Sequence, residues 1–155
     1  DCRGADADQP NEFTRQRDKL LQALLGLNAD IIGLNELENT PNVDPLASIT
    51  SGMPGYTAIN TGVIGTDAIK VGLIYRPSVV TPIGPYKLLT SAVDSRFIDT
   101  KSRPSLAQTF EVNATGARFT VVVNHFKSKG SACTDNAVDR FLLTGTAPPA
   151  GTVCR

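Results

Sequence analysis

Residues 29–36 read Ala-Asp-Ile-Ile-Gly-Leu-Asn-Glu, and the fold class follows from this stretch. An apolar run of this length directly after a helix is typical of a central strand buried on both faces. The residues upstream predict that helix, because apolar side chains recur at three- and four-residue spacing from Phe13 to Leu25. Asn11 is placed to cap the helix, which we expect over residues 12–27. This helix and the strand after it together predict a sheet that is covered by helices.

The rest of the chain is rich in strand signals. Short apolar segments separated by Gly, Pro and Asn predict strands at Tyr56–Asn60, Lys70–Arg76, Val79–Ile83, Tyr86–Leu89, Ser105–Val112 and Arg118–Phe126. The last of these is the strongest, because three consecutive valines lie in it. Together with the helix, these strands predict a mixed fold of the α/β (α+β) class.

Length and charge limit what the chain can be. It has 155 residues, 41% of them apolar, and a formal net charge of zero, which is ordinary for one globular domain. The neutral balance argues against a wholly basic nucleic-acid-binding protein, so a polyanion would have to meet a local patch. Apolar runs stay well below the ~18 residues of a membrane span, and we therefore expect none.

The chain has three cysteines, Cys2, Cys133 and Cys154. They form no Cys-x-x-Cys pair and only one histidine is present, so a structural zinc site is not expected. Cys133 and Cys154 flank a polar, loop-like segment, which suits a disulfide and would leave Cys2 without a partner in this chain. A disulfide implies an oxidising compartment and hence secretion. The alternative is three unrelated thiols in a cytosolic protein.

Glu36 stands at the carboxyl end of the first predicted strand, before a polar turn at residues 38–41. A carboxylate beside a dry strand is costly unless it has a partner or a metal ion. Mg²⁺ suits such a position, since it often takes one or two carboxylates and completes its shell with water and substrate phosphate. Two alternatives stay open. Glu36 could begin a solvated turn, or it could form a glycosidase-like carboxylate pair with Glu38.

Two further residues could carry phosphate chemistry. His125, the only histidine, ends the strongest strand and could transfer a proton near neutral pH, or it could be an ordinary histidine at a sheet edge. Arg103 could hold a phosphate with its planar guanidinium, or it could face water. With neighbouring lysines it would form a cationic patch for a phosphate-bearing substrate; these are Lys101, Lys127 and Lys129.

Three stretches resemble motifs of the endonuclease/exonuclease/phosphatase superfamily, in particular its DNase I-like members. Residues 30–39 (DIIGLNELEN) resemble the metal-ligand strand, and residues 121–130 (VVVNHFKSKG) resemble the strand of the catalytic histidine. Residues 70–77 (KVGLIYRP) resemble the strand between them. Arg103 then matches the position of a phosphate-contacting arginine. The amino-acid sequence of these motifs is most similar to that of the secreted bacterial nucleases of the superfamily.

The resemblance implies a four-layer α/β sandwich of two mostly antiparallel sheets with helices outside. Residues 1–155 would form a single partial domain, the N-terminal half. The family's first strand would precede Cys2, and its later Gly-Asp-x-Asn and Ser-Asp-His motifs do not occur in the sequence. Asp67 is the candidate for the acidic group that orients the family's histidine.

The resemblance also implies a function, namely metal-assisted hydrolysis of a phosphodiester by a secreted, extracellular bacterial enzyme. Glu36 would hold Mg²⁺, or alternatively Mn²⁺ or Ca²⁺. Adjoining strands would carry Glu36 and His125. His125 would exchange a proton or bind a phosphoryl oxygen, and Arg103 would clamp a neighbouring phosphate. DNA is the favoured partner, contacted through its backbone by a monomer. The alternatives are a phosphoesterase acting on lipid or inositol head groups, and an inactive truncated secreted module.

Overall fold

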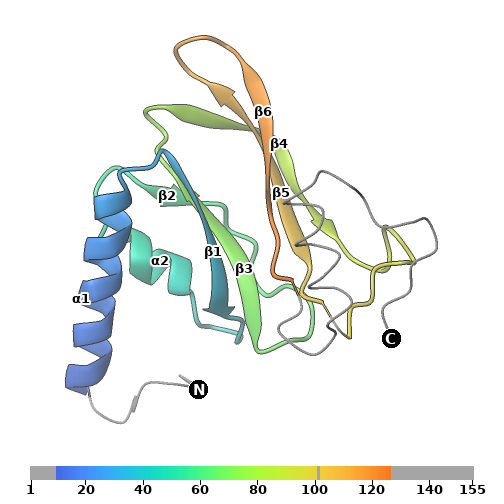
Figure 1. The fold of residues 1–155 in the computed structure, drawn as a ribbon, viewed down its shortest axis with the longest axis horizontal. Coiled ribbons are helices and arrows are strands. Elements are labelled where there is room, and N and C mark those ends of the chain that lie inside the picture. The colour runs from blue at the N-terminus through green and yellow to red at the C-terminus, as the bar shows by residue number, and fades with distance from the viewer. Residues whose placement is uncertain (1–9, 101, 127–155) are drawn as a thin grey trace, which may run out of the picture. The chain divides into compact units, whose positions relative to one another are not determined.

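The computed structural model describes residues 10–100 and 102–126 (Figure 1). Every helix and strand of the described residues belongs to one unit of the chain, which ends at His125. Cys133, Cys154, Lys101, Lys127 and Lys129 lie outside the described residues, so the predicted disulfide and the lysine part of the cationic patch stay predictions.

The described part of the chain forms two small antiparallel sheets and two helices, which confirms the α+β class. In chain order the elements are α1 (Pro10–Leu27), β1 (Ile31–Glu38), α2 (Pro45–Thr50), β2 (Thr57–Ala58), β3 (Ile69–Tyr75), β4 (Val80–Leu89), β5 (Ser105–Val112) and β6 (Arg118–Val123). The first sheet has the order β1-β3-β2 and the second the order β4-β5-β6. Neither α1 nor α2 is long and apolar enough to cross a membrane.

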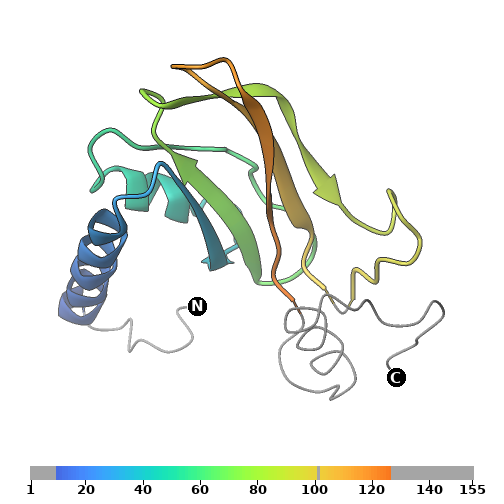
Figure 2. The ribbon, with the colours of Figure 1, turned by 45° about the horizontal axis from the view of Figure 1, so that its top comes forward.

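The first sheet is packed on both faces. Its helix-side face carries Ile32 and Ile74, which pack with Leu24 of α1 and Leu46 of α2. Figures 1 and 2 show the two helices on this side of the sheet. Because side chains alternate along a strand, the intervening β3 residues face the other way and contact the second sheet. This gives a layer of helices, then one sheet, then the other. No described helix covers the outer face of the second sheet, so the fourth layer of the predicted sandwich is not among the described residues.

An aromatic cluster joins the two sheets. Phe110 of β5 is fully buried, and its ring lies 5.2 Å from that of Tyr75 in β3 and 6.2 Å from that of Phe119 in β6. Leu73 and Leu106 are also fully buried in the same cluster. The interface therefore depends on large side chains from strands far apart in the sequence.

The helix differs in two ways from its prediction. It begins at Pro10 rather than after a cap at Asn11, in keeping with the preference of proline for the first helical turn. The buried stripe is also narrower than expected: Leu21 and Leu24 are buried, whereas Phe13 is 50% exposed.

The predicted strands are present, with corrected bounds. β1 lies at the edge of its sheet in the described residues and is not buried on both faces, because Gly33, Asn35 and Glu36 are exposed. The two segments predicted around Gly84 form one strand, β4, with a register irregularity between Ile83 and Lys87. A strand with such an irregularity bends without ending.

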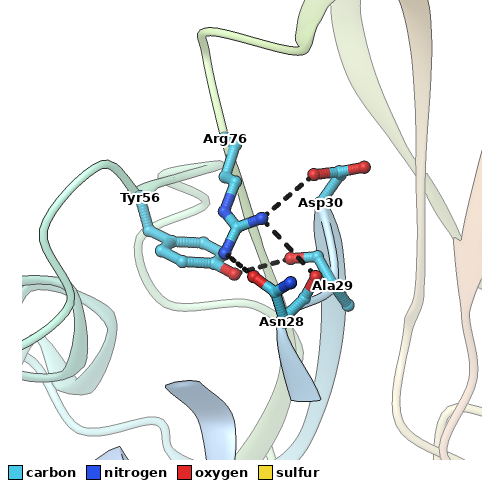
Figure 3. A network of polar contacts seen from close by, with 5 residues as sticks. All are labelled: Asn28, Ala29, Asp30, Tyr56 and Arg76. Carbon is cyan, nitrogen blue, oxygen red and sulfur yellow. Dashed lines mark hydrogen bonds and ion pairs between the residues drawn. The ribbon is translucent and has the colours of Figure 1, made fainter. Parts of the chain in front are cut away.

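A polar cluster fixes the turn from α1 into β1 (Figure 3). Arg76, just after β3, donates to Oδ1 of Asn28 at 2.7 Å and to Oδ1 of Asp30 at 3.2 Å. Its guanidinium lies 4.7 Å from the ring centroid of Tyr56, whose hydroxyl donates to the carbonyl of Ala29 at 2.6 Å. These contacts hold the start of β1 against the end of β3.

We expect Phe110→Ala to lower the free energy of unfolding by about 3–5 kcal/mol, because it removes a large side chain from the centre of the interface. Denaturant unfolding of the purified variant measures the loss. Val122→Ala is the control, since Val122 is 52% exposed, and its cost should stay within about 0.5 kcal/mol. Equal costs for the two variants would contradict the central place of Phe110 in the core.

Candidate functional site

A β-bulge interrupts β1 where its polar residues begin. Leu34 pairs with Gly72 of β3 and Leu37 pairs with Lys70, so Asn35 and Glu36 together stand opposite a single β3 position. Glu36 has a φ of 60°, in the left-handed region that residues other than glycine rarely adopt. Bulges of this kind redirect side chains and are common beside active sites.

The bulge places Glu36 next to His125. Oε1 of Glu36 lies 3.7 Å from Nε2 of His125, within ion-pair range but beyond a normal hydrogen bond. The Glu36 side chain is 72% exposed and that of His125 only 13%. A water-facing carboxylate thus lies beside a largely buried imidazole, a pairing suited to holding a cation and a phosphate next to a group that can transfer a proton.

The two side chains come from strands of different sheets that lie against each other. Glu36 is in β1 of the first sheet, and His125 follows β6 of the second sheet by two residues. Gly33 lets these strands approach, because an added Cβ there would lie 3.1 Å from Cγ2 of Val123. The missing side chain at this position leaves room for the close approach of β1 and β6.

Asp67 does not orient His125 as predicted. The Nδ1 atom of His125 is buried and has no hydrogen-bond partner in the described part of the chain. Asp67 is directed instead toward Arg103, whose Nε lies 3.1 Å from Oδ2 of Asp67 without the alignment of a hydrogen bond. The acidic side chain is thus used to hold the arginine.

Arg103 lies two residues before β5 and its side chain is 21% exposed. Its ion pair is with Asp67 and not with Glu36 or His125. The structure therefore brings the predicted acid and imidazole together, and connects the predicted arginine to the segment between β2 and β3.

Asn39 and Lys70 are two of the buried polar residues that the sequence does not single out. Asn39, just after β1, is 6% exposed, and its side chain bonds to residues 64 and 67. Lys70 is 4% exposed, and its Nζ donates to the carbonyl of Gly62 at 2.5 Å. Burial lowers the pKa of Lys70, and the Asp44 carboxylate opposes that shift. In the sequence, Asn39 is marked only by its place after an apolar strand. That pattern is typical of an ordinary turn.

Metal binding at this site depends on how many ligating side chains gather there. Within residues 10–100 and 102–126, no three His, Cys, Asp or Glu side chains gather into a cluster that could hold a metal ion. A cavity of about 260 Å³ on the first sheet is lined by Lys70 and Asp44 among others, but by neither Glu36 nor His125. Among the described residues, Glu36 is the exposed carboxylate that lies beside His125.

Comparison with solved structures places this geometry in a known fold. The chain is similar to an endonuclease/exonuclease/phosphatase from Bacteroides vulgatus (TM-score 0.61, 21% identity) over 88% of this chain and 54% of the other. It is also similar to the human Nocturnin catalytic domain with bound sulfate (0.59, 16%; 85% and 52%). A Bacteroides thetaiotaomicron protein of the endonuclease/exonuclease/phosphatase family gives 0.60 and 18% (90% and 51%).

The chain has the endonuclease/exonuclease/phosphatase fold. It spans about half the length of each of these three structures. In the sequence comparisons, no protein-family model matches the chain, and no curated protein matches it significantly. The structural likeness, at identities of 16–21%, establishes the endonuclease/exonuclease/phosphatase fold and not the reaction.

The left-handed backbone of Glu36 gives a prediction that does not involve activity. We expect Glu36→Gly to be more stable than Glu36→Ala by about 1 kcal/mol, because only glycine adopts a φ of 60° without steric cost. Denaturant midpoints of the two variants measure the difference. At Glu111, in regular β5, the same pair should reverse its order, since glycine weakens an ordinary strand. Greater stability of Glu36→Ala would contradict the bulge geometry.

Proposed function

We propose that this chain contributes to a metal-dependent phosphodiesterase, a secreted bacterial nuclease that acts on DNA. The observation that carries the proposal is the contact between Glu36 and His125, at 3.7 Å, in a chain with the endonuclease/exonuclease/phosphatase fold. Motif likeness at residues 30–39 and 121–130 supports the same assignment of the two side chains.

Glu36 is the residue that would hold a divalent cation. Its carboxylate is 72% exposed, so there is room around it for water and a phosphate. Mg²⁺ fits a single protein carboxylate, because it keeps several waters and takes phosphate oxygens as ligands; Mn²⁺ and Ca²⁺ are the alternatives. When bound, such an ion neutralises charge that develops on the phosphoryl oxygens.

His125 is placed for proton transfer. Its Nε2 faces Glu36, and the imidazole is 13% exposed, so the ring presents one nitrogen to the site while Nδ1 stays buried. This nitrogen would give a proton to the leaving oxygen, take one from the attacking water, or bind a phosphoryl oxygen.

Arg103 is proposed to bind a neighbouring phosphate of the nucleic-acid backbone. Its Nε is directed to Asp67 at 3.1 Å, and the outer edge of a guanidinium remains suited to two parallel bonds to phosphate. Contacts of this kind position a backbone without reading its sequence. The bound sulfate named for the human Nocturnin structure, a tetrahedral oxyanion like phosphate, is consistent with this use of the fold.

Secretion, a Cys133–Cys154 disulfide and a monomeric state belong to the same proposal, and the cysteine pattern supports the first two. A phosphoesterase of this fold that acts on lipid or inositol phosphates is the second candidate. It would hydrolyse small phosphate esters in preference to plasmid DNA. An inactive module is the third candidate.

The test is plasmid nicking by the complete protein that contains this chain, with Mg²⁺ and with EDTA. We expect nicking that EDTA abolishes, and a loss of about 10²–10⁴-fold in His125→Ala, because a proton-transfer group contributes that much. Glu36→Gln should lose activity to a similar degree while binding Mg²⁺ more weakly in calorimetry.

The matched control is Glu111→Gln, which removes a partly exposed carboxylate that pairs with Arg118 in the second sheet, and it should nick at the wild-type rate. Undiminished nicking by His125→Ala or Glu36→Gln would remove that residue from its role. Hydrolysis of inositol phosphates with intact plasmid would favour the second candidate, and no hydrolysis of either substrate would favour the third.

A further inference from the structure

We propose that Asn39 is a positioning residue that sets the orientation of Arg103 through the segment of residues 64–68. The inference rests on the proposed function, which assigns Arg103 to a substrate phosphate. It extends that function by linking the arginine to the end of the strand that carries Glu36.

The side chain of Asn39 holds the segment at both ends. Its Nδ2 donates to the carbonyl of Ile64 at 2.7 Å and to that of Asp67 at 2.9 Å, and its Oδ1 accepts from the amide of Ile64 at 3.0 Å. The backbone amide of Asn39 also donates to the carbonyl of Ala68 at 2.9 Å. A side chain that is 6% exposed thus uses both of its donors and its acceptor on this one segment.

The segment in turn holds Arg103. Oδ1 of Asp67 accepts from the amide of Ile69 at 3.3 Å, which leaves Oδ2 facing Nε of Arg103 at 3.1 Å. That Nε is buried and has no hydrogen bond among the described residues, so the Asp67 carboxylate is the group that compensates its charge. A change in the position of Asp67 therefore changes the environment of the guanidinium directly.

A packing contact acts on the same place. Gly65 has a φ of 65°, and a Cβ added to it would lie 2.9 Å from Cδ of Pro104. The segment thus touches the residue next to Arg103 as well as Arg103 itself. Asn39 lies three residues beyond Glu36 in the sequence. The end of β1 therefore positions the Glu36 carboxylate directly, and it positions Arg103 through residues 64–68.

The test is steady-state kinetics of the complete protein on a phosphodiester substrate with Mg²⁺. We expect Asn39→Ala to raise KM by about tenfold with little change in kcat, because a misplaced guanidinium weakens binding without altering the reacting groups. In an Arg103→Ala background, Asn39→Ala should raise KM no further. Asp67→Asn, at a side chain that is 44% exposed, should reproduce the effect of Asn39→Ala without threatening the fold.

The control is Gln108→Ala. Gln108 is 2% exposed, and its Nε2 donates to the carbonyl of Gly84 at 3.2 Å in a bend of β4, so this variant also removes a buried amide that holds a backbone segment. It should lose stability as Asn39→Ala does and keep the wild-type KM. Additive effects of Asn39→Ala and Arg103→Ala, or a tenfold rise of KM in Gln108→Ala, would overturn the proposal.

A second measurement separates this inference from the proposed function. If the wild-type protein hydrolyses no phosphodiester, the proposed function fails, and the Nε–H resonance of Arg103 still reveals its environment by NMR. We expect that resonance to shift in both Asp67→Asn and Asn39→Ala. A shift in Asp67→Asn alone would show that Asn39 does not act on Arg103.

Discussion

One extra residue in β1 determines how this strand presents Glu36 to solvent. The change of pairing register between Leu34 and Leu37 leaves Asn35 and Glu36 opposite one position of β3, with Glu36 in a left-handed conformation. In a regular strand, alternation would place every second side chain in a packed face. The bulge instead releases the carboxylate into water beside His125, and the cost of its strained backbone is carried by the buried residues on either side.

The packing of the two sheets holds Glu36 in its place beside His125. Phe110 and its neighbours set the spacing of the sheets, and Gly33 permits the contact with Val123 that brings the end of β6 to β1. On the far side of the first sheet, the helices cover Ile32 and Ile74, while Arg76 and Tyr56 hold the turn that leads into β1. The bulged strand is therefore held at its start, on its helix side and at Gly33.

The sequence predicts the helices and strands better than it predicts the strand register and the contacts between distant segments. The apolar runs of β1, β3 and β6 are sufficient to place these strands, although only β3 is buried along most of its length. The bulge was not predictable, since a register depends on the partner strand. The pairing of Asp67 with Arg103, and the burial of Asn39, depend on segments far apart in the sequence, and short polar motifs carry no information about them. Glu36 and His125 were found through their place after apolar strands and through family motifs.

The bulge in β1 is what brings Glu36 to His125, and this role can be measured directly. The measurement is the nuclear Overhauser effect between the γ protons of Glu36 and the Hε1 proton of His125, in the wild-type protein and after deletion of Asn35. With Oε1 and Nε2 at 3.7 Å, the cross-peak should appear in the wild type. It should vanish in the deletion, which restores a regular ladder while β3 signals persist. A missing wild-type cross-peak, or one that survives the deletion, would contradict this role of the bulge.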